Sequence, residues 1–339
     1  MTRQQRFMLG TISGAAAALA AWRGMRRRSA IDFNGRVVVI TGGSRGLGLV
    51  LARQLAAEGA RLCLLARDHD ELQRARRQLP ETSEVLVLAC DVRNRDDVRR
   101  AIAQVLARWT AVDVLINNAG IIQVGPFEHM NEADFEDALA THFWGPLHLI
   151  LEVVPSMRRR GFGRIVNISS IGGRIAVPHM APYCSSKFAL VGLSDAVRSE
   201  LIRFGIRVTT VTPGLMRTGS APNAQVKGRH EAEYAWFAIA DSIPGLSTSA
   251  DRAARKIIEA ARYGDPELTI TMAAQCGILL GAVAPGIAAR ALMLANSLLP
   301  GVTGPEGNER RRGRESETRV TKSFATALTQ RAAVANNEL

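Results

Sequence analysis

The sequence predicts an α/β protein in which helices cover both faces of a parallel sheet. Short runs rich in Val, Ile and Leu have the length and composition of buried strands, and helix-length segments separate them. Because parallel strands are joined by crossovers, repeated βα units of this kind build one sheet with two covered faces. The predicted strands span residues 36–40, 61–66, 84–89, 112–116, 164–168 and 206–211.

A glycine-rich turn directly follows the first predicted strand, and a helical pattern continues from it to Gly59. The turn reads Thr41-Gly42-Gly43-Ser44-Arg45-Gly46-Leu47-Gly48. Glycines at 42, 46 and 48 allow a tight turn, a close approach of the backbone to a pyrophosphate, and close packing of helix on strand. The first helical turn would offer unpaired N–H groups to the phosphates. The pattern predicts a dinucleotide site, and the alternative is an ordinary βα turn.

A hydroxyl, a phenol and an ammonium group occur at a spacing that suits a proton-transfer site. If a helix begins at Ala181-Pro182, Tyr183 and Lys187 lie one turn apart on the same face. The lysine cation would then stabilise the phenolate and lower the tyrosine pKa from about 10 toward neutral pH. Ser170 lies shortly before this helix and supplies the hydroxyl. The alternative is a surface tyrosine beside a solvated lysine.

Ordered motifs over residues 34–265 together resemble the short-chain dehydrogenase/reductase family. They are Thr41-Gly42-x-x-x-Gly46-x-Gly48, Cys90-Asp91-Val92, Asn117-Asn118-Ala119-Gly120, Ser170, Tyr183-x-x-x-Lys187 and Pro213-Gly214-x-x-x-Thr218. The resemblance implies a single doubly wound parallel-sheet domain of the Rossmann type, here over residues 31–270, that binds a nicotinamide dinucleotide.

The same resemblance implies where the cofactor contacts lie. Asp91 and Val92 would lie near the adenine, and the segment from Pro213 through Gly214 to Thr218 near the nicotinamide. The motif at 117–120 would support the central sheet. Its last three residues are also expected to contact the cofactor: Asn118, Ala119 and Gly120.

Catalytic roles also follow from the resemblance. Tyr183 would donate a proton to the substrate carbonyl oxygen while hydride leaves C4 of the nicotinamide, and Ser170 would hydrogen-bond the same oxygen. Lys187 would tune the phenol and hold the nicotinamide ribose. The family's serine lies thirteen residues before the tyrosine, which selects Ser170 over Ser169.

One position departs from the family pattern. The family usually carries an asparagine in the helix after the Asn-Asn-Ala-Gly motif, where it relays protons through a water to the lysine. Here His142 takes its place. Histidine can also hydrogen-bond water, so His142 is expected to take part in catalysis with an altered relay geometry and pH dependence. The alternative is a helix histidine with a structural hydrogen bond.

Charge favours NADP(H) over NAD(H) as the cofactor. An acidic residue at the end of the second strand usually accepts hydrogen bonds from the ribose diol of NAD, and this chain has Ala66 there. Arg67 follows, and Arg45 lies in the glycine turn, so two guanidinium groups can converge on a 2′-phosphate. The alternative is a pair of solvated surface charges.

Composition excludes several function classes. The four cysteines have no paired spacing, which indicates a reducing compartment without a disulfide framework. The six histidines lack ligand spacing with cysteines or acids, so no metal is expected. Of the net charge of +12, residues 1–30 contribute six arginines and no acid. A nucleic-acid surface would interleave aromatics with its basic residues, whereas these charges flank apolar runs, so no nucleic-acid partner is expected.

An apolar and basic segment precedes the predicted domain. Residues 7–22 carry no charge and arginines bracket them, but a membrane span needs about 20 residues. We therefore expect residues 1–30 to form a tilted or interfacial membrane anchor, with the catalytic domain on the cytoplasmic side. The alternative is an alanine-rich disordered leader on a cytoplasmic protein.

Two further segments follow the predicted domain. Residues 271–303 are apolar, and Pro285-Gly286 should divide them into two short helices. We consider three uses for this pair of helices: membrane contact, a cover over a lipophilic substrate, or a dimer seam. Membrane contact ranks first because the N-terminal segment suggests it too, and a homo-oligomer is also expected. The polar residues 304–339, with an arginine-rich run at 310–314, are predicted to be mostly disordered.

The substrate is expected to be a lipophilic ketone or secondary alcohol, which points to lipid metabolism. The family places its substrate loop between the Pro-Gly motif and the next helix, here about residues 214–248. Aromatic and apolar residues in this loop suggest an apolar lining: Tyr234, Trp236, Phe237 and Ile239. The rival hypothesis is a catalytically silent scaffold that binds nucleotide as a sensor.

Overall fold

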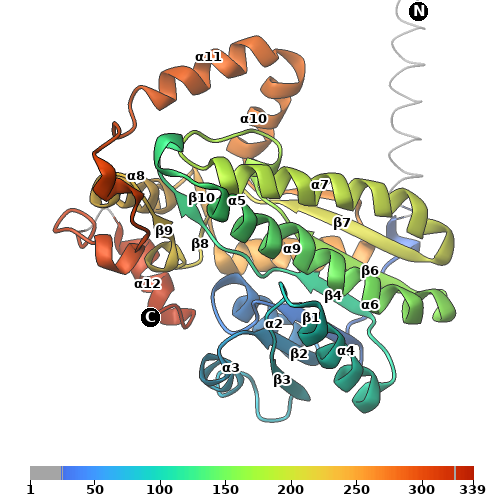
Figure 1. Cartoon of the computed structure of the whole chain (residues 1–339). Coiled ribbons are helices and arrows are strands. Elements are labelled where there is room, and N and C mark those ends of the chain that lie inside the picture. Colours follow the sequence, from blue (N-terminus) through green and yellow to red (C-terminus); the bar gives the residue numbers. More distant parts are fainter. Residues whose placement is uncertain (1–23, 25, 324–325) are drawn as a thin grey trace, which may run out of the picture.

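A seven-stranded parallel sheet forms the centre of the computed structural model, which describes residues 24, 26–323 and 326–339 (Figure 1). The strand order is β11-β7-β6-β4-β1-β2-β3. The strands are β1 (Val37–Thr41), β2 (Arg61–Ala66), β3 (Val85–Ala89), β4 (Val114–Asn117), β6 (Gly163–Ile168), β7 (Ile206–Thr212) and β11 (Glu267–Thr269). Each predicted strand is present, and within this sheet only the short edge strand β11 was not predicted.

Helices cover both faces of this sheet, as the alternating pattern predicted. One apolar core lies between the sheet and α2 (Gly46–Ala57), α3 (His69–Arg76) and α9 (Ala250–Tyr263). The other lies between the sheet and α4 (Arg95–Trp109), α6 (Gly145–Arg160) and α7 (Ala181–Leu201). Alternate residues of β1 enter different cores, with Val38 and Ile40 in the first and Val37 and Val39 in the second. The doubly wound α/β fold is therefore confirmed.

The functional edge of the sheet follows from the strand order. The chain adds β2 and β3 on one side of β1, then crosses over and adds β4 and β6 on the other side. In a doubly wound sheet, ligands bind in the crevice beyond the carboxyl ends of the strands at such a reversal. The turn that follows β1 and the segment that follows β4 meet at this point.

Smaller elements build a wall beside this edge. Between β4 and α6 lie β5 (Gln123–Val124), α5 (Glu132–Leu139) and a π-helical turn, Ala140–Trp144. After β7 come β8 (Leu215–Arg217), β9 (Gln225–Val226), α8 (His230–Ser242) and β10 (Ser247–Ser249). The predicted substrate loop is therefore largely α8 and short strands. Short single turns connect these parts: Phe127–His129, Ile171–Gly173, Ile202–Phe204 and Ala221–Asn223.

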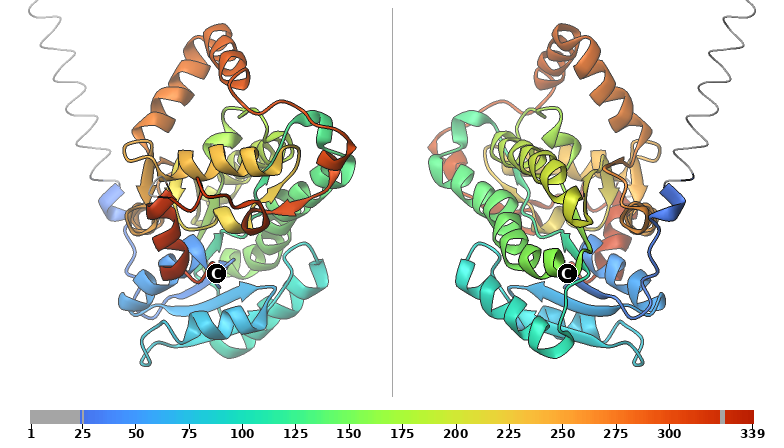
Figure 2. Two further views of the ribbon diagram at one scale, coloured as in Figure 1. Left: turned by 90° about the vertical axis from the view of Figure 1, so that its left-hand side faces the viewer. Right: turned by 90° about the vertical axis from the view of Figure 1, so that its right-hand side faces the viewer.

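A helical arm projects from the domain next to the functional edge. It consists of α10 (Met272–Val283) and α11 (Pro285–Asn296), and the break at Pro285 agrees with the prediction (Figure 2). Only Ala274 of the arm's two helices is fully buried, whereas Leu279 and Leu294 are 64% and 68% exposed. Among the helices that the structure describes, none is long and apolar enough to cross a membrane. The predicted anchor at residues 1–30 lies mostly outside the described residues.

The C-terminal tail differs from its prediction. Residues 304–339 were expected to be disordered, but the described part of them folds back on the domain. The tail forms turns at Pro305–Asn308 and Gly313–Ser316, the strand β12 (Arg311–Arg312) beside β9, and the helix α12 (Ala327–Ala335).

Polar contacts to distant residues explain why the tail is ordered. Arg310 donates hydrogen bonds to the buried Asp134, at 2.7 Å, and to Asp137, at 2.8 Å. The hydroxyls of Thr329 on α12 and Ser242 on α8 lie 2.7 Å apart. A polar composition indicates disorder because it buries little apolar area. Here specific polar partners supply the stabilisation that the composition could not indicate.

Candidate active site

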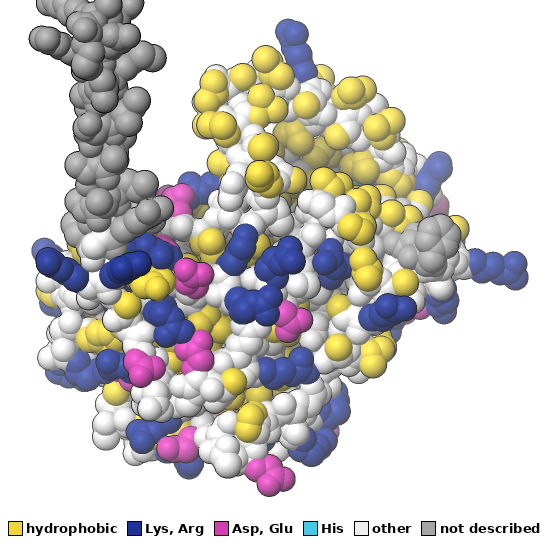
Figure 3. Space-filling view, turned by 180° about the vertical axis from the view of Figure 1, so that it is seen from behind, with side chains coloured by type: hydrophobic (Ala, Val, Ile, Leu, Met, Phe, Trp, Pro, Cys, Tyr) yellow, Lys and Arg dark blue, Asp and Glu magenta, His cyan; other side chains and the backbone are white. Residues whose placement is uncertain are grey.

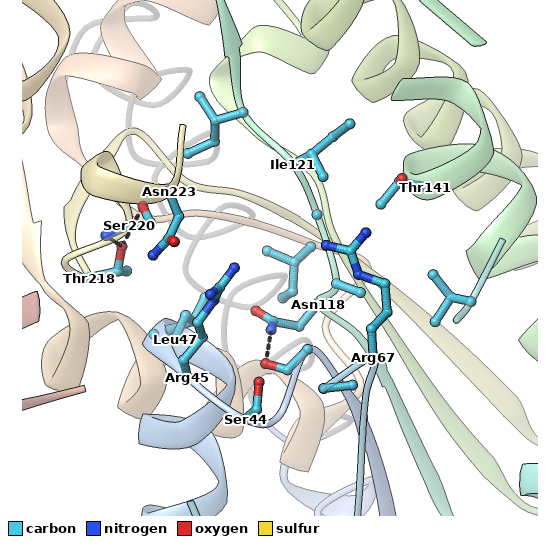
Figure 4. Close-up of a pocket in the computed structure, with 18 of the residues that line it drawn as sticks. Ser44, Arg45, Leu47, Arg67, Asn118, Ile121, Thr141, Thr218, Ser220 and Asn223 are labelled. Carbon is cyan, nitrogen blue, oxygen red and sulfur yellow. Dashed lines mark hydrogen bonds between the residues drawn. The ribbon is translucent and has the colours of Figure 1, made fainter. Parts of the chain in front are cut away.

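A cavity of about 480 Å³ lies at the carboxyl edge of the sheet and collects most of the predicted site residues (Figure 4). The predicted residues that line it are Gly42, Ser44, Arg45, Gly46, Leu47, Arg67, Asp91, Val92, Asn118, Ala119, Gly120, His142, Tyr183, Lys187 and Thr218. They come from both halves of the sheet and from α7. Residues more than 170 positions apart in the chain thus share one cavity wall.

The glycine turn is tied to the residue after β4 by a side-chain amide, and close backbone contacts within the turn leave no room for side chains. A Cβ on Gly48 would collide with the carbonyl oxygen of Gly42, so α2 can pack this closely only with glycine there. Gly42 also has a φ of +62°, a conformation that favours glycine. The Asn118 amide donates to the carbonyls of Thr41, at 3.0 Å, and Gly42, at 3.2 Å. The turn therefore points the start of α2 into the cavity.

Tyr183 and Lys187 lie on α7 as the spacing predicted, with Pro182 in the first turn of that helix. The Lys187 Nζ lies 5.7 Å from the centroid of the Tyr183 ring and donates to the carbonyl of Ile168 at 2.9 Å. Ser170, which follows β6, hydrogen-bonds to the Tyr183 phenol. The phenol, hydroxyl and ammonium groups thus meet at one end of the cavity.

Burial, and not the lysine charge, dominates the acidity of these groups. Burial raises the pKa of Tyr183 to about 12, although the hydrogen bond from Ser170 acts in the opposite direction. Burial also lowers the pKa of Lys187 to about 7. The expectation that Lys187 would bring the phenol pKa toward neutral pH is therefore not met in the protein alone. Tyr183 remains protonated at neutral pH and has a proton to donate.

His142 is held by the protein through both ring nitrogens. The backbone N–H of Ile121 donates to its Nε2 at 3.1 Å, so the proton of the neutral ring resides on Nδ1. The Nδ1–H points at the Ser186 hydroxyl, 2.7 Å away, and that hydroxyl donates to the carbonyl of Tyr183. Burial, and after it the charge of Lys187, holds the pKa of His142 well below its usual value.

These contacts favour the structural alternative for His142 over a proton relay. A relay needs a ring nitrogen that can exchange a proton with water, whereas both nitrogens here are engaged by protein groups. The ring also packs edge-on against Tyr183, with centroids 5.4 Å apart. His142 therefore ties the 117–122 segment to α7 and orients the tyrosine.

The predicted phosphate-binding arginines differ in their surroundings. Figure 4 shows Arg45 and Arg67 extending into the cavity from the glycine turn and from the end of β2. Arg45 is paired with Glu71 at 3.1 Å and with Glu338 at 3.3 Å. Within the described part of the chain, no hydrogen bond or ion pair engages the Arg67 side chain. Arg67 lies near Asp91: burial acts to raise the pKa of Asp91, but hydrogen bonds from Arg93, and to a smaller extent the charge of Arg67, hold it below its usual value.

Some predicted residues lie just behind the cavity wall. Gly48 packs on Gly42, Ser170 hydrogen-bonds to the lining Tyr183, and Pro213 accepts a hydrogen bond from Ile171 at 2.7 Å. Gly214 packs against Thr271, the N-cap of α10. In the predicted substrate loop, Tyr234 and Phe237 are buried in a small apolar cluster that also contacts Tyr183. They support the wall and do not line the cavity.

Other lining residues were not predicted. Glu71, Asn223, Arg312, Arg314 and Glu338 all border the cavity. Three of them belong to the C-terminal tail, which the polar composition had led us to exclude from the fold. Arg314 donates to Asn223 at 3.2 Å, so the tail and the 214–224 segment form one wall together.

The site fits a nicotinamide dinucleotide. Gly46 and Gly48 let the backbone at the start of α2 come close to a pyrophosphate, in a space that the Glu338 carboxylate takes in this structure, and Arg67, Tyr183 and Lys187 line the same cavity. No cluster of three or more His, Cys, Asp or Glu side chains suited to a metal occurs in residues 24, 26–323 and 326–339. Cys63, Cys90 and Cys184 are buried free thiols, and Cys276 is exposed.

The tautomer of His142 tests its structural role. We predict that His142 stays neutral with the proton on Nδ1 between about pH 6 and pH 8, because burial disfavours the cation. Two-dimensional ¹H–¹⁵N spectra of the imidazole nitrogens would measure this, and loss of the signals in His142→Asn would assign them. A titration midpoint within that range, or a proton on Nε2, would restore the relay hypothesis.

Comparisons with known proteins agree with this geometry. The short chain dehydrogenase family matches residues 36–227. A dehydrogenase/reductase SDR family protein 7-like from Anopheles gambiae is 36% identical over 205 residues, which cover 58% of this chain and 64% of that relative. A 3-ketodihydrosphingosine reductase from Bacteroides thetaiotaomicron is 34% identical over 203 residues, 59% of this chain and 72% of the relative.

A solved structure adds cofactor information. A metagenomic short-chain oxidoreductase in complex with NADP is similar with a TM-score of 0.52 and 36% identity, covering 54% of this chain and 84% of that one. The family match spans the glycine turn, the strand ends and the Tyr183 helix that together form the cavity. This chain therefore belongs to the short-chain dehydrogenase/reductase family of oxidoreductases, which act on CH–OH and C=O groups.

Proposed function

We propose that the protein uses NADP(H) to reduce a lipophilic ketone to a secondary alcohol, with Tyr183 as the general acid. The observation that carries this proposal is the half-buried phenol of Tyr183, which lines the cavity with Lys187 and hydrogen-bonds to Ser170. A protonated phenol can donate the proton that the carbonyl oxygen needs during reduction.

Each residue of the site has its own role in the reduction. NADPH, when bound, supplies the hydride that adds to the carbonyl carbon. Tyr183 gives its proton to the carbonyl oxygen, and the Ser170 hydroxyl donates a hydrogen bond to the same oxygen as negative charge develops there. Burial lowers the pKa of Lys187 to about 7, so both of its forms are populated at neutral pH, and the charged form would stabilise the phenolate left behind. His142 keeps the ring of Tyr183 in place.

The preference for NADP(H) rests on charge at the end of β2. Ala66 offers no carboxylate to a ribose diol, and Arg67 extends into the cavity directly after it. A guanidinium group forms strong charge-assisted bonds to a phosphate. The NADP bound to the similar metagenomic oxidoreductase supports the same preference.

A lipophilic substrate is supported by the cavity wall and by one relative. Ile121, Ile122 and Met216 give the cavity an apolar side next to Tyr183 and Thr218. The name of the Bacteroides thetaiotaomicron relative describes reduction of a ketone on a long-chain sphingoid base. We infer that the substrate carries its ketone on an apolar chain, which agrees with a role in lipid metabolism.

The alternative is a nucleotide-binding scaffold without catalysis. A sensor would need a cofactor site but no proton donor. The meeting of Tyr183, Ser170 and Lys187 at one end of the cavity favours the enzyme.

We also propose that the helical arm binds a lipid surface on the cytoplasmic side of a membrane. Hydrophobic side chains gather over the projecting arm (Figure 3). They include Met272, Leu279, Val283, Ile287, Met293 and Leu294, and Leu298 lies just after α11; each is more than 60% exposed. Contiguous exposed apolar side chains of this kind mark interaction surfaces. The exposed Arg290 on α11 suits the anionic headgroups of such a surface. A seam between two copies of the chain is the competing use.

Removal of one hydroxyl tests the catalytic assignment. Tyr183→Phe should retain NADPH affinity and lose about 100-fold or more in kcat, since general acid catalysis contributes typically 10²–10⁴-fold. Turnover of a long-chain 3-ketone and NADPH fluorescence titration would be measured together. Tyr234→Phe is the matched control, because Tyr234 is buried nearby without lining the cavity. Near-normal turnover by Tyr183→Phe would rule out the assignment.

A second substitution tests the cofactor preference. Arg67→Ala should weaken NADPH binding about 10-fold or more and leave NADH binding nearly unchanged, because a hydrogen bond to a charged group is worth about 1.5–3 kcal/mol. Dissociation constants for both cofactors would be compared with those of Arg61→Ala, a change of a half-exposed arginine that lies outside the cavity and pairs with Glu84. Equal losses for the two cofactors would show that Arg67 acts on a group they share.

Vesicle sedimentation tests the lipid surface. The full chain should bind vesicles of phosphatidylcholine and phosphatidylserine, and binding should persist in high salt because it is mainly hydrophobic. The double variant Leu279→Ser, Leu294→Ser should bind several-fold less, whereas Leu151→Ser, at a half-exposed position on α6, should bind normally. Unchanged binding by the double variant would contradict the proposal. Loss of a dimer in that variant would assign the arm to a subunit seam.

A further inference from the structure

The end of the chain, residues 336–339, lies against the glycine turn of the cofactor site. We call these residues the terminal segment. In Figures 1 and 2 the C-terminus follows α12 to the region where β1 and α2 meet. The N–H of Gly46, at the start of α2, donates to the carbonyl of Asn336 at 2.9 Å. The Asn337 amide donates to the carbonyl of Ser44, also at 2.9 Å. The terminal segment therefore binds the loop that the cofactor needs.

The opposite wall of the cavity holds the same segment. The Asn336 amide donates to the carbonyl of Thr218 at 3.1 Å. The Asn223 amide donates to Glu338 twice, to the backbone carbonyl at 2.9 Å and to the carboxylate at 2.7 Å. The terminal segment thus crosses from the glycine turn to the 214–224 segment.

Glu338 brings a negative charge to the start of α2. Its side chain is only 4% exposed, and its carboxylate pairs with Arg45. A Cβ on Gly46 would collide with the Glu338 Oε1, so the carboxylate occupies the space that this glycine leaves open. Glycine at this position of a dinucleotide turn serves the close approach of a pyrophosphate, and the helix start attracts anions.

The carboxylate and a pyrophosphate therefore require the same place. Both are anions that are attracted to the N–H groups at the positive end of α2, and two negative charges in the same space repel each other. We propose that the terminal segment competes with the cofactor's pyrophosphate for the start of α2, so that cofactor binding displaces Glu338. This inference depends on the dinucleotide site but not on the ketone substrate.

Only the terminal segment has to move for Glu338 to leave the start of α2. Helix α12 remains attached upstream, where Ala333 packs against Gly219 and Thr329 contacts Ser242. Beyond Glu338 the last residue, Leu339, is 72% exposed. Burial raises the pKa of Glu338 to about 7 even though Arg45 and Asn223 act in the opposite direction. Because burial disfavours the charged form of this carboxylate, it weakens the attachment of the terminal segment to the glycine turn.

Removal of the charge tests the competition directly. Glu338→Gln should tighten binding of NADPH and of NADH by at least about fivefold, the lower end of typical coupling between sites, because both cofactors carry the pyrophosphate. Dissociation constants measured by fluorescence titration need no substrate. The control is Glu309→Gln, an exposed acid on the same tail that pairs with Arg311. Unchanged or weaker binding, or a gain confined to NADPH, would overturn the proposal.

A measurement on the unmodified chain covers the case in which Glu338→Gln fails to fold. Amide hydrogen exchange of residues 336–339 should become faster when saturating NADP⁺ is added, because the displaced terminal segment loses its contacts, whereas exchange in α12 should stay unchanged. Slower exchange would mean that the segment closes over the cofactor instead of competing with it. No change would mean that cofactor and segment bind side by side. Either of these results would contradict the proposal.

Discussion

The start of α2 is the constraint on which the functional edge of this protein depends. Close packing of Gly48 on Gly42 brings the helix against β1 and directs its first N–H groups into the cavity. Those groups must find acceptors, because a buried helix end without partners is costly. In this chain Asn336 supplies one acceptor, and Glu338 supplies the negative charge. The terminal segment thus supplies acceptors to the same N–H groups of α2 that a bound cofactor would use.

Burial is the second determinant of the site. Tyr183, Lys187 and His142 are all enclosed by α7, the end of β6 and the segment after β4, and desolvation is the main influence on the pKa of each. For Tyr183 this favours the protonated phenol, and for His142 the neutral ring. Desolvation therefore keeps Tyr183 as a proton donor and His142 as a neutral structural residue, although the two rings are only 5.4 Å apart.

Local patterns predicted those parts of the molecule that depend on nearby residues. Apolar runs rich in Val, Ile and Leu located the inner strands, the glycine spacing located the cofactor turn, and helical periodicity placed Tyr183 and Lys187 on one face. Contacts between distant residues could not be predicted in this way. The hydrogen bond from Asn337 to Ser44 spans 293 positions, and the pairing of Arg310 with Asp134 spans 176. The partners of His142, and the burial that sets the acidity of Tyr183, likewise appear only after the chain folds.

Transfer of isotope from cofactor to product tests the central claim most directly. NADPH deuterated at C4 would be incubated with the full-length protein and a long-chain 3-ketone, and the product would be analysed by mass spectrometry. If the buried site reduces a lipophilic ketone, deuterium should appear on the carbinol carbon in the wild type and be nearly absent with Tyr183→Phe. Cofactor binding without any deuterated alcohol, across a panel of lipophilic ketones, would contradict this account and favour the nucleotide-binding scaffold.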